Sequence, residues 1–567
     1  MLLAPLPYPQ PDTLVAVWNR WDGRPAAALS DPELMDYAEQ ARALRLAAVA
    51  PAAVNLSGPG QPERVPAAFV TAATFPVLGV APVLGRGFVD AEEQEGRDRV
   101  AVLTHGLWTR RFQSDAGVVG RTLRVNGQAF EIVGVMPPGF LLPSDFRSET
   151  AAQVLLPLTL DRAAPRNRRG GHYLQAVARL APGVTRTAAQ AEMDAILQRL
   201  VALYPEEHDQ GHFGITVAPL RDDLLGPSRP ILAVLLAAVG LVLLLACANL
   251  ASLLLARGEA RRRELAVRAS LGAGRFRLVR QMVTESCVLG LLGGAAGLAV
   301  AAVAMKALLA LDPGTLPRAQ QAALSLPVVA FTAAVSIGSG LLFGLLPAAQ
   351  LTRVALDHAL REAGRSNVGG RGRLRRALVA AQAAIAVVLL AGAGLLGKSF
   401  ARLADVPAGF EAAGVLTFRT TAPPARYGPR AEVSRFYARL LDEVRALPAV
   451  RVAGAGSGLP LSVQSGDWGF DVEGRAEVPG NRARADWFVV TPGYFEALSV
   501  PLVRGRLPRA GDDEQGPPVI FMNETAARLT FPGQDAIGQR VRLSRTTGEE
   551  QPWRAVAGVV ADVRQRG

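Results

Sequence analysis

Four long runs of apolar residues are the dominant pattern of the chain. They cover residues 231–256, 286–305, 326–346 and 377–397, and no charged side chain interrupts them. A helix that crosses a bilayer needs about 20 apolar residues, because the hydrocarbon core is about 30 Å thick. Glycine and alanine are frequent in all four runs, which suits close packing between helices in lipid. The pattern predicts four membrane-spanning helices rather than the buried helices of a soluble core.

Arginines concentrate in two of the connections between these runs. Residues 257–280 carry eight arginines against two acidic residues, and residues 351–376 carry seven against two. Residues 312–325 carry only one residue of each sign. Short cytoplasmic loops of membrane proteins are enriched in lysine and arginine. The asymmetry predicts that both arginine-rich connections lie in the cytoplasm, so the long N- and C-terminal regions lie outside the membrane.

These two patterns predict an order of segments along the chain. The expected segments are a first external domain (1–228), a span (229–256), a cytoplasmic coupling loop (257–281), a span (282–311), a short external loop (312–325), a span (326–350), a cytoplasmic basic linker (351–376), a span (377–398) and a second external domain (399–567).

The two external regions repeat each other in sequence. Five residues recur at a constant offset of 420, and the pairs are Phe75/Phe495, Leu78/Leu498, Val80/Val500, Gly85/Gly505 and Arg86/Arg506. Residues 110–127 also match residues 527–544 with one residue inserted, and residues 130–140 match residues 553–563. Short alternating segments between Gly- and Pro-rich turns, such as 130–135 and 556–560, predict a small β-rich lobe in each copy.

Beside each β-rich lobe, the hydrophobic periodicity predicts an α/β lobe. In the first copy, residues 173–180 alternate as a strand, and another strand is expected near Ile215. The helix between them places four apolar residues on one face, namely Met193, Ile196, Leu197 and Leu200. In the second copy, we expect a strand over 415–421, a helix with its apolar face over 436–444, and a strand beginning near Val452. Such strand–helix–strand units favour a ferredoxin-like lobe.

The expected fold class is therefore membrane α-helical with four spans, combined with two α+β domains outside the membrane. The repeat also predicts missing segments. About 90 residues follow the segment at 130–138 in the first copy before the membrane is reached, whereas the second copy ends at the equivalent point. We therefore expect a further half-domain and its return spans beyond residue 567, and one more span before residue 1 to export the first domain.

Composition agrees with a membrane protein without a catalytic centre. The formal net charge is +12, but the arginine-rich connections contain much of the excess, so we expect no nucleic-acid partner. Both cysteines, Cys247 and Cys287, lie in apolar runs, and the five histidines are scattered, so we expect neither a disulfide framework nor a metal or other cofactor. The sequence contains no Ser/His/Asp set and no HExxH motif, which argues against an enzyme.

One stretch fits a nucleotide-binding pattern by letters alone. Residues 392–399 read GAGLLGKS, which matches the P-loop pattern G-x-x-x-x-G-K-[ST]. A P-loop needs a preceding strand and a following helix, so that backbone N–H groups surround a phosphate. Here an apolar run precedes the motif, and the charge asymmetry places Lys398 at the external face. We interpret it as a Gly-rich helix end whose lysine reaches the membrane surface.

The best-defined motif lies in the first cytoplasmic loop. Residues 260–269 favour a helix, and Gly272 and Gly274 end it. Taken alone, such a loop could be a basic juxtamembrane helix that meets anionic lipid. Its sequence also resembles a pattern close to RRREIAVRxALGA in permeases of the MacB/FtsX/LolE superfamily of ABC transporters. The residues that carry the resemblance are Arg261, Arg262, Arg263, Glu264, Leu265, Ala266, Val267, Arg268, Ala269, Ser270, Leu271, Gly272 and Ala273.

The resemblance covers essentially the whole chain. The duplicated layout is similar to the branch called acidobacterial duplicated orphan permeases, whose architecture has eight spans, so this chain would lack the first and the last three. The resemblance implies a bacterial inner membrane protein with periplasmic domains, each with a porter-like and a β-rich subdomain. The loop helix would dock on a separate cytoplasmic ABC ATPase, whose closure would be transmitted through the membrane to the external domains.

The resemblance leaves two functions open. The first is a permease subunit that moves or releases an external substrate, with a periplasmic adaptor as a further partner. The second is a non-transporting membrane scaffold or regulator of the FtsX type, which acts on cell-wall hydrolases. Both would use the loop at residues 257–280. A gene for an adaptor beside this one would favour export, and a gene for a hydrolase would favour regulation.

Overall fold

The structure is a computed structural model that describes most of the chain. The described residues are 6–21, 24–58, 61–148, 150–160, 171–204, 213–226, 229–260, 275–311, 326, 328–341, 369–422, 427, 430–461, 467–475, 483–543 and 551–564. They form two compact units, of which one combines residues 3–226 with 407–567 and the other contains residues 227–406.

The first α+β domain contains a four-stranded antiparallel sheet in the order β11-β1-β10-β3. The chain passes through β1, α1, β3, β10, α4 and β11 in turn, which is the βαββαβ order of a ferredoxin-like lobe. The bounds are β1 (Leu14–Trp21), α1 (Asp31–Gln40), β3 (Leu44–Ser57), β10 (Gln175–Leu180), α4 (Arg186–Leu203) and β11 (Gly214–Pro219). The expected strands at 173–180 and near Ile215, and the ferredoxin-like interpretation, are confirmed for this copy.

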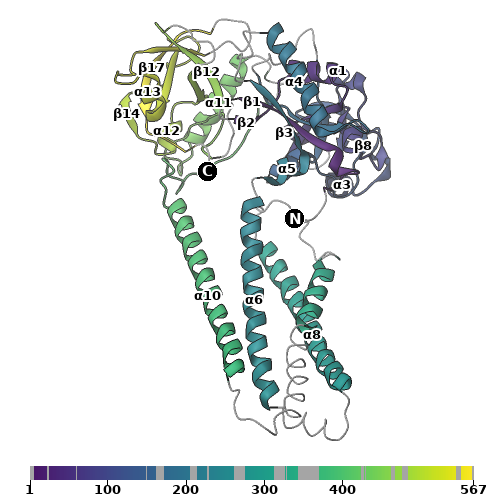
Figure 1. Cartoon of the computed structure of the whole chain (residues 1–567). Coiled ribbons are helices and arrows are strands. Elements are labelled where there is room, and N and C mark those ends of the chain that lie inside the picture. The colour runs from purple at the N-terminus through teal and green to yellow at the C-terminus, as the bar shows by residue number, and fades with distance from the viewer. Residues whose placement is uncertain are drawn as a thin grey trace, which may run out of the picture. The chain divides into compact units, whose positions relative to one another are not determined.

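Helices α1 and α4 cover one face of this sheet (Figure 1). The four apolar residues expected on one face of the second helix are all buried there, at 0–5% exposure. Thr185 caps the N-terminus of α4 by accepting a hydrogen bond from the Ala188 N–H. The opposite face of the sheet is covered by other segments, which include α5 (Leu220–Leu225) and Leu142 just before η4 (Pro143–Arg147).

A β-rich lobe is inserted between β3 and β10 of the ferredoxin-like lobe. Its strands extend the same sheet beyond β3, in the order β3-β4-β9-β6-β8-β5, and β7 pairs with both β3 and β8. The remaining elements of this domain are η1 (Pro11–Thr13), β2 (Arg24–Ala27), β4 (Glu63–Val70), α2 (Thr74–Leu78), β5 (Leu84–Gly85), η2 (Asp90–Glu93), β6 (Val100–Leu103), α3 (His105–Phe112), η3 (Ala116–Val118), β7 (Thr122–Val125), β8 (Gln128–Val135) and β9 (Val154–Pro157).

The second α+β domain repeats the pairings of β4-β3-β7-β8-β5, with β6 beside β8, and its described residues include no counterpart of β9. Its sheet has the order β13-β12-β16-β17-β14, with β15 beside β17. The elements are α11 (Arg430–Arg445), β12 (Asp467–Val472), β13 (Ala483–Asp486), α12 (Tyr494–Ala497), β14 (Leu502–Gly505), β15 (Val519–Asn523), α13 (Glu524–Thr530), β16 (Arg540–Leu543) and β17 (Arg554–Val560). In each copy one parallel strand pair has a single register shift, between β6 and β8 in the first and between β15 and β17 in the second.

The matched Gly–Arg pairs of the repeat have the same structural role in both copies. Gly85 and Gly505 have positive φ angles of 67° and 77°. Arg86 N–H donates to the Val133 carbonyl at 2.9 Å, and the N–H of Arg506 donates to the Ala557 carbonyl at 3.1 Å. The two arginine side chains also bind carboxylates six residues further on, which are Glu92 and Asp512. The sequence repeat is therefore a structural repeat.

The prediction of two strands in the α/β lobe of the second copy is wrong. Residues 415–421 and the segment near Val452 are not strands, although α11 forms as expected. In the first copy, β1 is held between β10 and β11. Among the described residues of the second domain, no strand takes the place of either neighbour. Residues 415–421 therefore lack strand partners, and Leu416 is 90% exposed.

The other compact unit contains the long apolar helices α6 (Arg229–Ala260), α8 (Arg275–Leu311) and α10 (Gly369–Ala404) (Figure 1). Two apolar stretches are long enough to cross a membrane by length and composition, Val283–Ala307 in α8 and Val379–Leu403 in α10. Two further apolar stretches, Ala233–Asn249 and Val328–Leu341, are shorter. The second and fourth expected spans thus have candidate helices of sufficient length, and the first and third stay predictions.

Small residues form the contact between α8 and the helix at 328–341. A Cβ atom added to Gly290 would lie 2.6 Å from the Ser336 carbonyl oxygen, and one added to Gly340 would lie 2.9 Å from Cys287 Cα. Ser336 is 8% exposed. The backbones approach so closely that only glycine fits at these positions, as the composition of the apolar runs predicts.

Candidate functional site

The predicted ATPase-coupling residues lie outside the described residues, which stop at Ala260 and resume at Arg275. This applies to Arg261, Arg262, Arg263, Glu264, Ala266, Arg268, Leu271, Gly272 and Ala273. The structure therefore describes only the two helices that flank the loop, α6 before it and α8 after it. The assignment of these residues stays a prediction.

The first turns of α8 are basic and exposed. The side chains of Arg277 and Arg280 border an open depression together with Gln281, Thr284 and Glu285. The Thr284 hydroxyl donates to the Arg280 carbonyl at 2.7 Å, which is a bond within the helix. The depression is wide, open and lined by one helix, so it has the character of a surface beside the loop rather than of an enclosed ligand site.

The stretch that resembles a P-loop lies within α10. Residues 392–399 continue a helix that begins at Gly369 and ends at Ala404. A helical backbone bonds its own N–H groups, so they are not free to surround a phosphate. The geometry supports the helical interpretation of these residues, but the helix continues past Lys398 to Ala404 and does not end at the motif.

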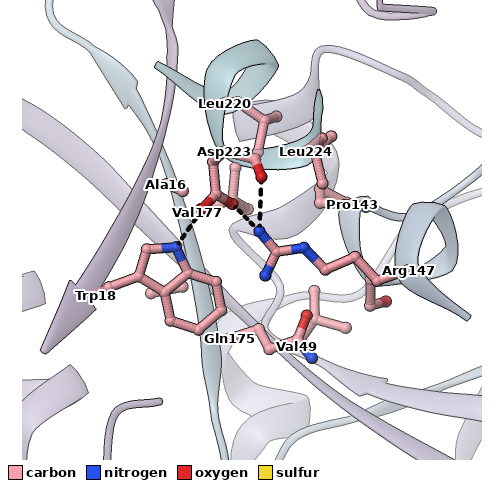
Figure 2. Close-up of a pocket in the computed structure, with 12 residues that line it drawn as sticks. Ala16, Trp18, Val49, Pro143, Arg147, Gln175, Val177, Leu220, Asp223 and Leu224 are labelled. Atoms are coloured by element: carbon pink, nitrogen blue, oxygen red, sulfur yellow. Dashed lines mark hydrogen bonds and ion pairs between the residues drawn. The ribbon is translucent and has the colours of Figure 1, made fainter. Parts of the chain in front are cut away.

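A partly buried polar site of the first domain is centred on the short helix α5. The short helix α5 follows β11 directly and ends four residues before α6 begins. Asp223 of α5 accepts a hydrogen bond from Trp18 Nε1 of β1 at 2.9 Å. Arg147 of η4 forms an ion pair with the Asp223 carboxylate at 2.7 Å and donates to the Asp223 carbonyl at 2.9 Å. Figure 2 shows both partners converging on Asp223 from different elements.

Trp18 and Arg147 also contact each other. The Arg147 guanidinium carbon lies 5.3 Å from the centre of the Trp18 ring, within the range of a cation–π interaction. Trp18 is 8% exposed and the Asp223 side chain 11%, so their hydrogen bond is largely shielded from water, whereas the Arg147 side chain is 38% exposed. We call Trp18, Arg147 and Asp223 the α5 anchor.

The cavity beside the α5 anchor is too small for a substrate. Its volume is about 20 Å³, which admits about one water molecule. Ligand pockets measure roughly 300–1,000 Å³. The lining is apolar apart from the anchor residues, Gln175 and Ser144, and the Ser144 hydroxyl is buried without a hydrogen-bond partner among the described residues. The anchor therefore holds protein segments together rather than binding a small molecule.

The 3-10 helix that supplies Arg147 contains a carboxyl group with an unusual pKa. Burial raises the pKa of Asp145 to about 6, and hydrogen bonds from the N–H groups of Ala152 and Leu142 oppose the shift. These bonds measure 3.0 Å and 2.8 Å. Asp145 thus fixes the backbone on both sides of η4, and its ionisation is costly because water is excluded.

The sequence did not reveal the α5 anchor. Its three residues are 76 and 205 positions apart along the chain, so no local spacing links them. The one available signal was the position of Asp223, a carboxylate just before an apolar run. Elsewhere in the described part of the chain, no group of three or more His, Cys, Asp or Glu side chains is arranged to hold a metal ion.

Comparison with known protein families gives two matches. A family model described as "MacB-like periplasmic core domain" matches residues 4–196 and again residues 377–567, together well over half of the chain. A second, "FtsX-like permease C-terminal", matches residues 236–355. The repetition of the first match agrees with the duplicated β-rich lobe.

Curated relatives cover part of the chain. The pyoverdine export ATP-binding/permease protein PvdT of Pseudomonas syringae pv. syringae is 25% identical over 282 residues, which is 49% of this chain and 40% of the relative. The macrolide export ATP-binding/permease protein MacB of Rhodospirillum rubrum is 28% identical over 286 residues, 50% of this chain and 41% of the relative. The alignments thus span about two fifths of these relatives.

Solved structures of separate domains are also similar. The periplasmic region of MacB from Actinobacillus actinomycetemcomitans matches 38% of this chain and 92% of that structure, with 15% identity and a TM-score of 0.28. A domain of a permease protein from Porphyromonas gingivalis matches with 17% identity and a TM-score of 0.30, over 38% of this chain and 92% of that structure.

Proposed function

The chain belongs to the MacB/FtsX-like family of ABC transporter permeases, and from this premise we propose that it is a membrane subunit driven by a separate cytoplasmic ATPase. The ATPase would dock on the loop between α6 and α8. Its motion would pass along the membrane helices to the periplasmic α+β domains. The chain itself would not hydrolyse ATP.

The observation that carries this proposal is the position of the loop. The FtsX-like match spans residues 236–355 and so contains the loop together with most of α6 and all of α8. The described end of the loop is basic and exposed, with Arg277 and Arg280 beside the depression on α8. A helix with exposed arginines at a membrane surface can meet either an acidic protein partner or anionic lipid. The match to permease relatives favours the protein partner.

We further propose the membrane arrangement that the charge pattern indicates. Four spans would join the two periplasmic domains, with the loop at 257–281 and the linker at 351–376 in the cytoplasm. The segment bounds would be those of the sequence analysis. The layout would be that of the duplicated orphan branch of the family.

The relatives' names give the class of process. PvdT and MacB are described as export proteins for pyoverdine and macrolides. We propose that this chain likewise takes part in the efflux or release of a substrate. The cavity at the α5 anchor admits about one water molecule, so it is too small to enclose a substrate.

Co-purification from the native host tests the proposal. The full-length protein would be extracted in mild detergent, and any bound ATPase identified by mass spectrometry. Ala266→Glu and Leu271→Glu should release the ATPase, since each places a carboxylate on the docking surface. Ala195→Glu is the matched control, because Ala195 is an exposed residue of helix α4 in the first domain.

Each outcome has a clear meaning. An ATPase bound to the native protein and to Ala195→Glu, but lost from the two loop variants, supports the permease subunit. A cell-wall hydrolase recovered with that ATPase would favour the regulator of FtsX type. If no ATPase binds the native protein, the coupling proposal is wrong and a passive scaffold remains.

A further inference from the structure

We propose that the cavity beside the α5 anchor is a binding site for one ordered water molecule, which hydrogen-bonds to the Ser144 hydroxyl and joins η4 to the sheet. The proposal concerns the first α+β domain alone and goes beyond the proposed function. It starts from the environment of one buried hydroxyl group.

The hydroxyl of Ser144 is buried without a protein partner. Ser144 is the second residue of η4 and is 5% exposed. Its Oγ atom is shielded from solvent and forms no hydrogen bond with another described residue. Burying a polar group without a partner is costly, and nearly all such groups in folded proteins bond to protein or to ordered water. A hydroxyl in this position therefore requires a further hydrogen-bonding partner.

The space beside Ser144 has the size of a water site. Ser144 borders the cavity, whose volume is about 20 Å³. A site for one water molecule needs at least roughly 10–15 Å³ of such volume, which this cavity provides. The same volume excludes an organic ligand, so water is the chemical class that fits.

Polar side chains from three elements border this space. Ser144 lies on η4, and Gln175 of β10 carries an amide that can both donate and accept hydrogen bonds. The Asp223 carboxylate of α5 accepts from Trp18 and Arg147 and keeps further lone pairs. Figure 2 shows Gln175, Arg147 and Asp223 around the cavity. A buried water typically makes about three hydrogen bonds, and one bound here would join η4, β10 and α5.

The alternative is a dry cavity. Cavities with purely apolar walls stay empty, and Val49, Val177 and Leu220 form part of this wall. A dry cavity would leave the Ser144 hydroxyl without a partner, whereas one water molecule satisfies it. The two states therefore make opposite predictions for removal of the hydroxyl.

Hydrogen exchange of the full chain in detergent, with Ser144→Ala and Ser144→Val, distinguishes the two states. In the hydrated site each substitution removes a hydrogen bond to the water. Amides of η4 and α5 should then exchange about two- to tenfold faster, as expected for the loss of one hydrogen bond. In a dry cavity each substitution would remove an unpartnered hydroxyl, and valine would also fill space, so exchange would slow.

Ser30 provides the matched control. Its Oγ atom is also buried and has no hydrogen-bond partner within the described part of the chain, but Ser30 does not border this cavity. It lies at the N-terminus of α1. Ser30→Ala should leave exchange in η4 and α5 unchanged, which would show that the effect of the Ser144 variants is local.

A cryo-EM map of the full chain, resolved finely enough to show ordered water, tests the site directly. It should contain a peak about 3 Å from Ser144 Oγ, and Ser144→Val should abolish the peak. Slower or unchanged exchange in either Ser144 variant, or a parent map without the peak, would overturn the proposal. If a variant loses protection throughout β1 and β10, the parent map decides. Neither measurement requires an ATPase, so failure here is distinct from failure of the proposed function.

Discussion

Substitution of the repeated glycines at β5 and β14 should destabilise one β-rich lobe at a time. Gly85 has a φ of +67°, and a Cβ atom there would lie 2.1 Å from the Val133 carbonyl oxygen. Gly505 has a φ of +77°, and its Cβ would lie 2.4 Å from the Ala557 carbonyl oxygen. In both cases the obstacle is backbone of the paired strand, which cannot rotate away.

The cost of Gly85→Ala has two parts. A left-handed backbone conformation costs an alanine about 1–2 kcal/mol. Forcing an atom into a filled site costs typically about 1–3 kcal/mol more. The sum is about 2–5 kcal/mol. Gly183 is the matched control, since its φ is +77° but its Cβ would meet nothing within 4 Å, so Gly183→Ala should cost only the first part.

Hydrogen exchange of the full chain in detergent measures these costs separately in each lobe. With about 1.4 kcal/mol per tenfold change, Gly85→Ala should accelerate exchange in β8 by roughly 30- to 4,000-fold and leave β17 unchanged. Gly505→Ala should do the reverse. Equal effects of Gly85→Ala and Gly183→Ala would refute the packing argument, and acceleration in both lobes at once would refute their independence.

Two further predictions concern a buried carboxyl and a helix contact. Burial raises the pKa of Asp145 from 3.8 to about 6, so folding favours the neutral carboxyl group. The contribution of this neutral group to the free energy of unfolding is complete below about pH 4 and is lost as the pH rises through 6. Thermal unfolding should thus show up to about 3 kcal/mol of pH-dependent stability that Asp145→Asn abolishes. The same dependence of stability on pH in the parent and in Asp145→Asn would contradict this. Gly340→Leu should push the helix at 328–341 away from α8 near Cys287 and lower the stability in detergent by about 1–3 kcal/mol. Gly338→Leu should be nearly neutral, because a Cβ atom added there would meet no atom within 4 Å. A similar loss in both variants would show that the close contact does not matter.

The β-rich lobes could be predicted because their determinants are local. A glycine with positive φ followed by an arginine that binds a carboxylate six residues later leaves the same letters in both copies. The ferredoxin-like lobe of the first copy could equally be predicted from the sequence, since the apolar residues of α4 recur with a clear helical period.

The second α/β lobe shows where periodicity stops being sufficient. Residues 415–421 alternate as a strand would, yet Leu416 and Phe418 are 90% and 61% exposed. Alternation records which face a residue would bury, but a strand exists only when neighbouring strands complete its hydrogen bonds. Those neighbours do not occur among the described residues of the second domain.

The α5 anchor illustrates a different limit. Trp18, Arg147 and Asp223 belong to a strand, a 3-10 helix and a short helix that meet only after folding. A single sequence contains no signal that joins them. The predicted docking loop is the converse case, since its residues form one continuous motif in the sequence, and its role stays a prediction.

The most direct test of the central claim is photo-crosslinking at the docking loop in living cells. A photoreactive amino acid would replace Leu271 in the full-length protein, and Gln198, an exposed residue of α4, would serve as the comparison site. The account predicts a crosslinked product containing an ABC ATPase from position 271 and none from position 198. Illumination that yields no ATPase product at position 271, while the protein is present in the membrane at its normal level, would contradict the coupling of this permease to ATP hydrolysis.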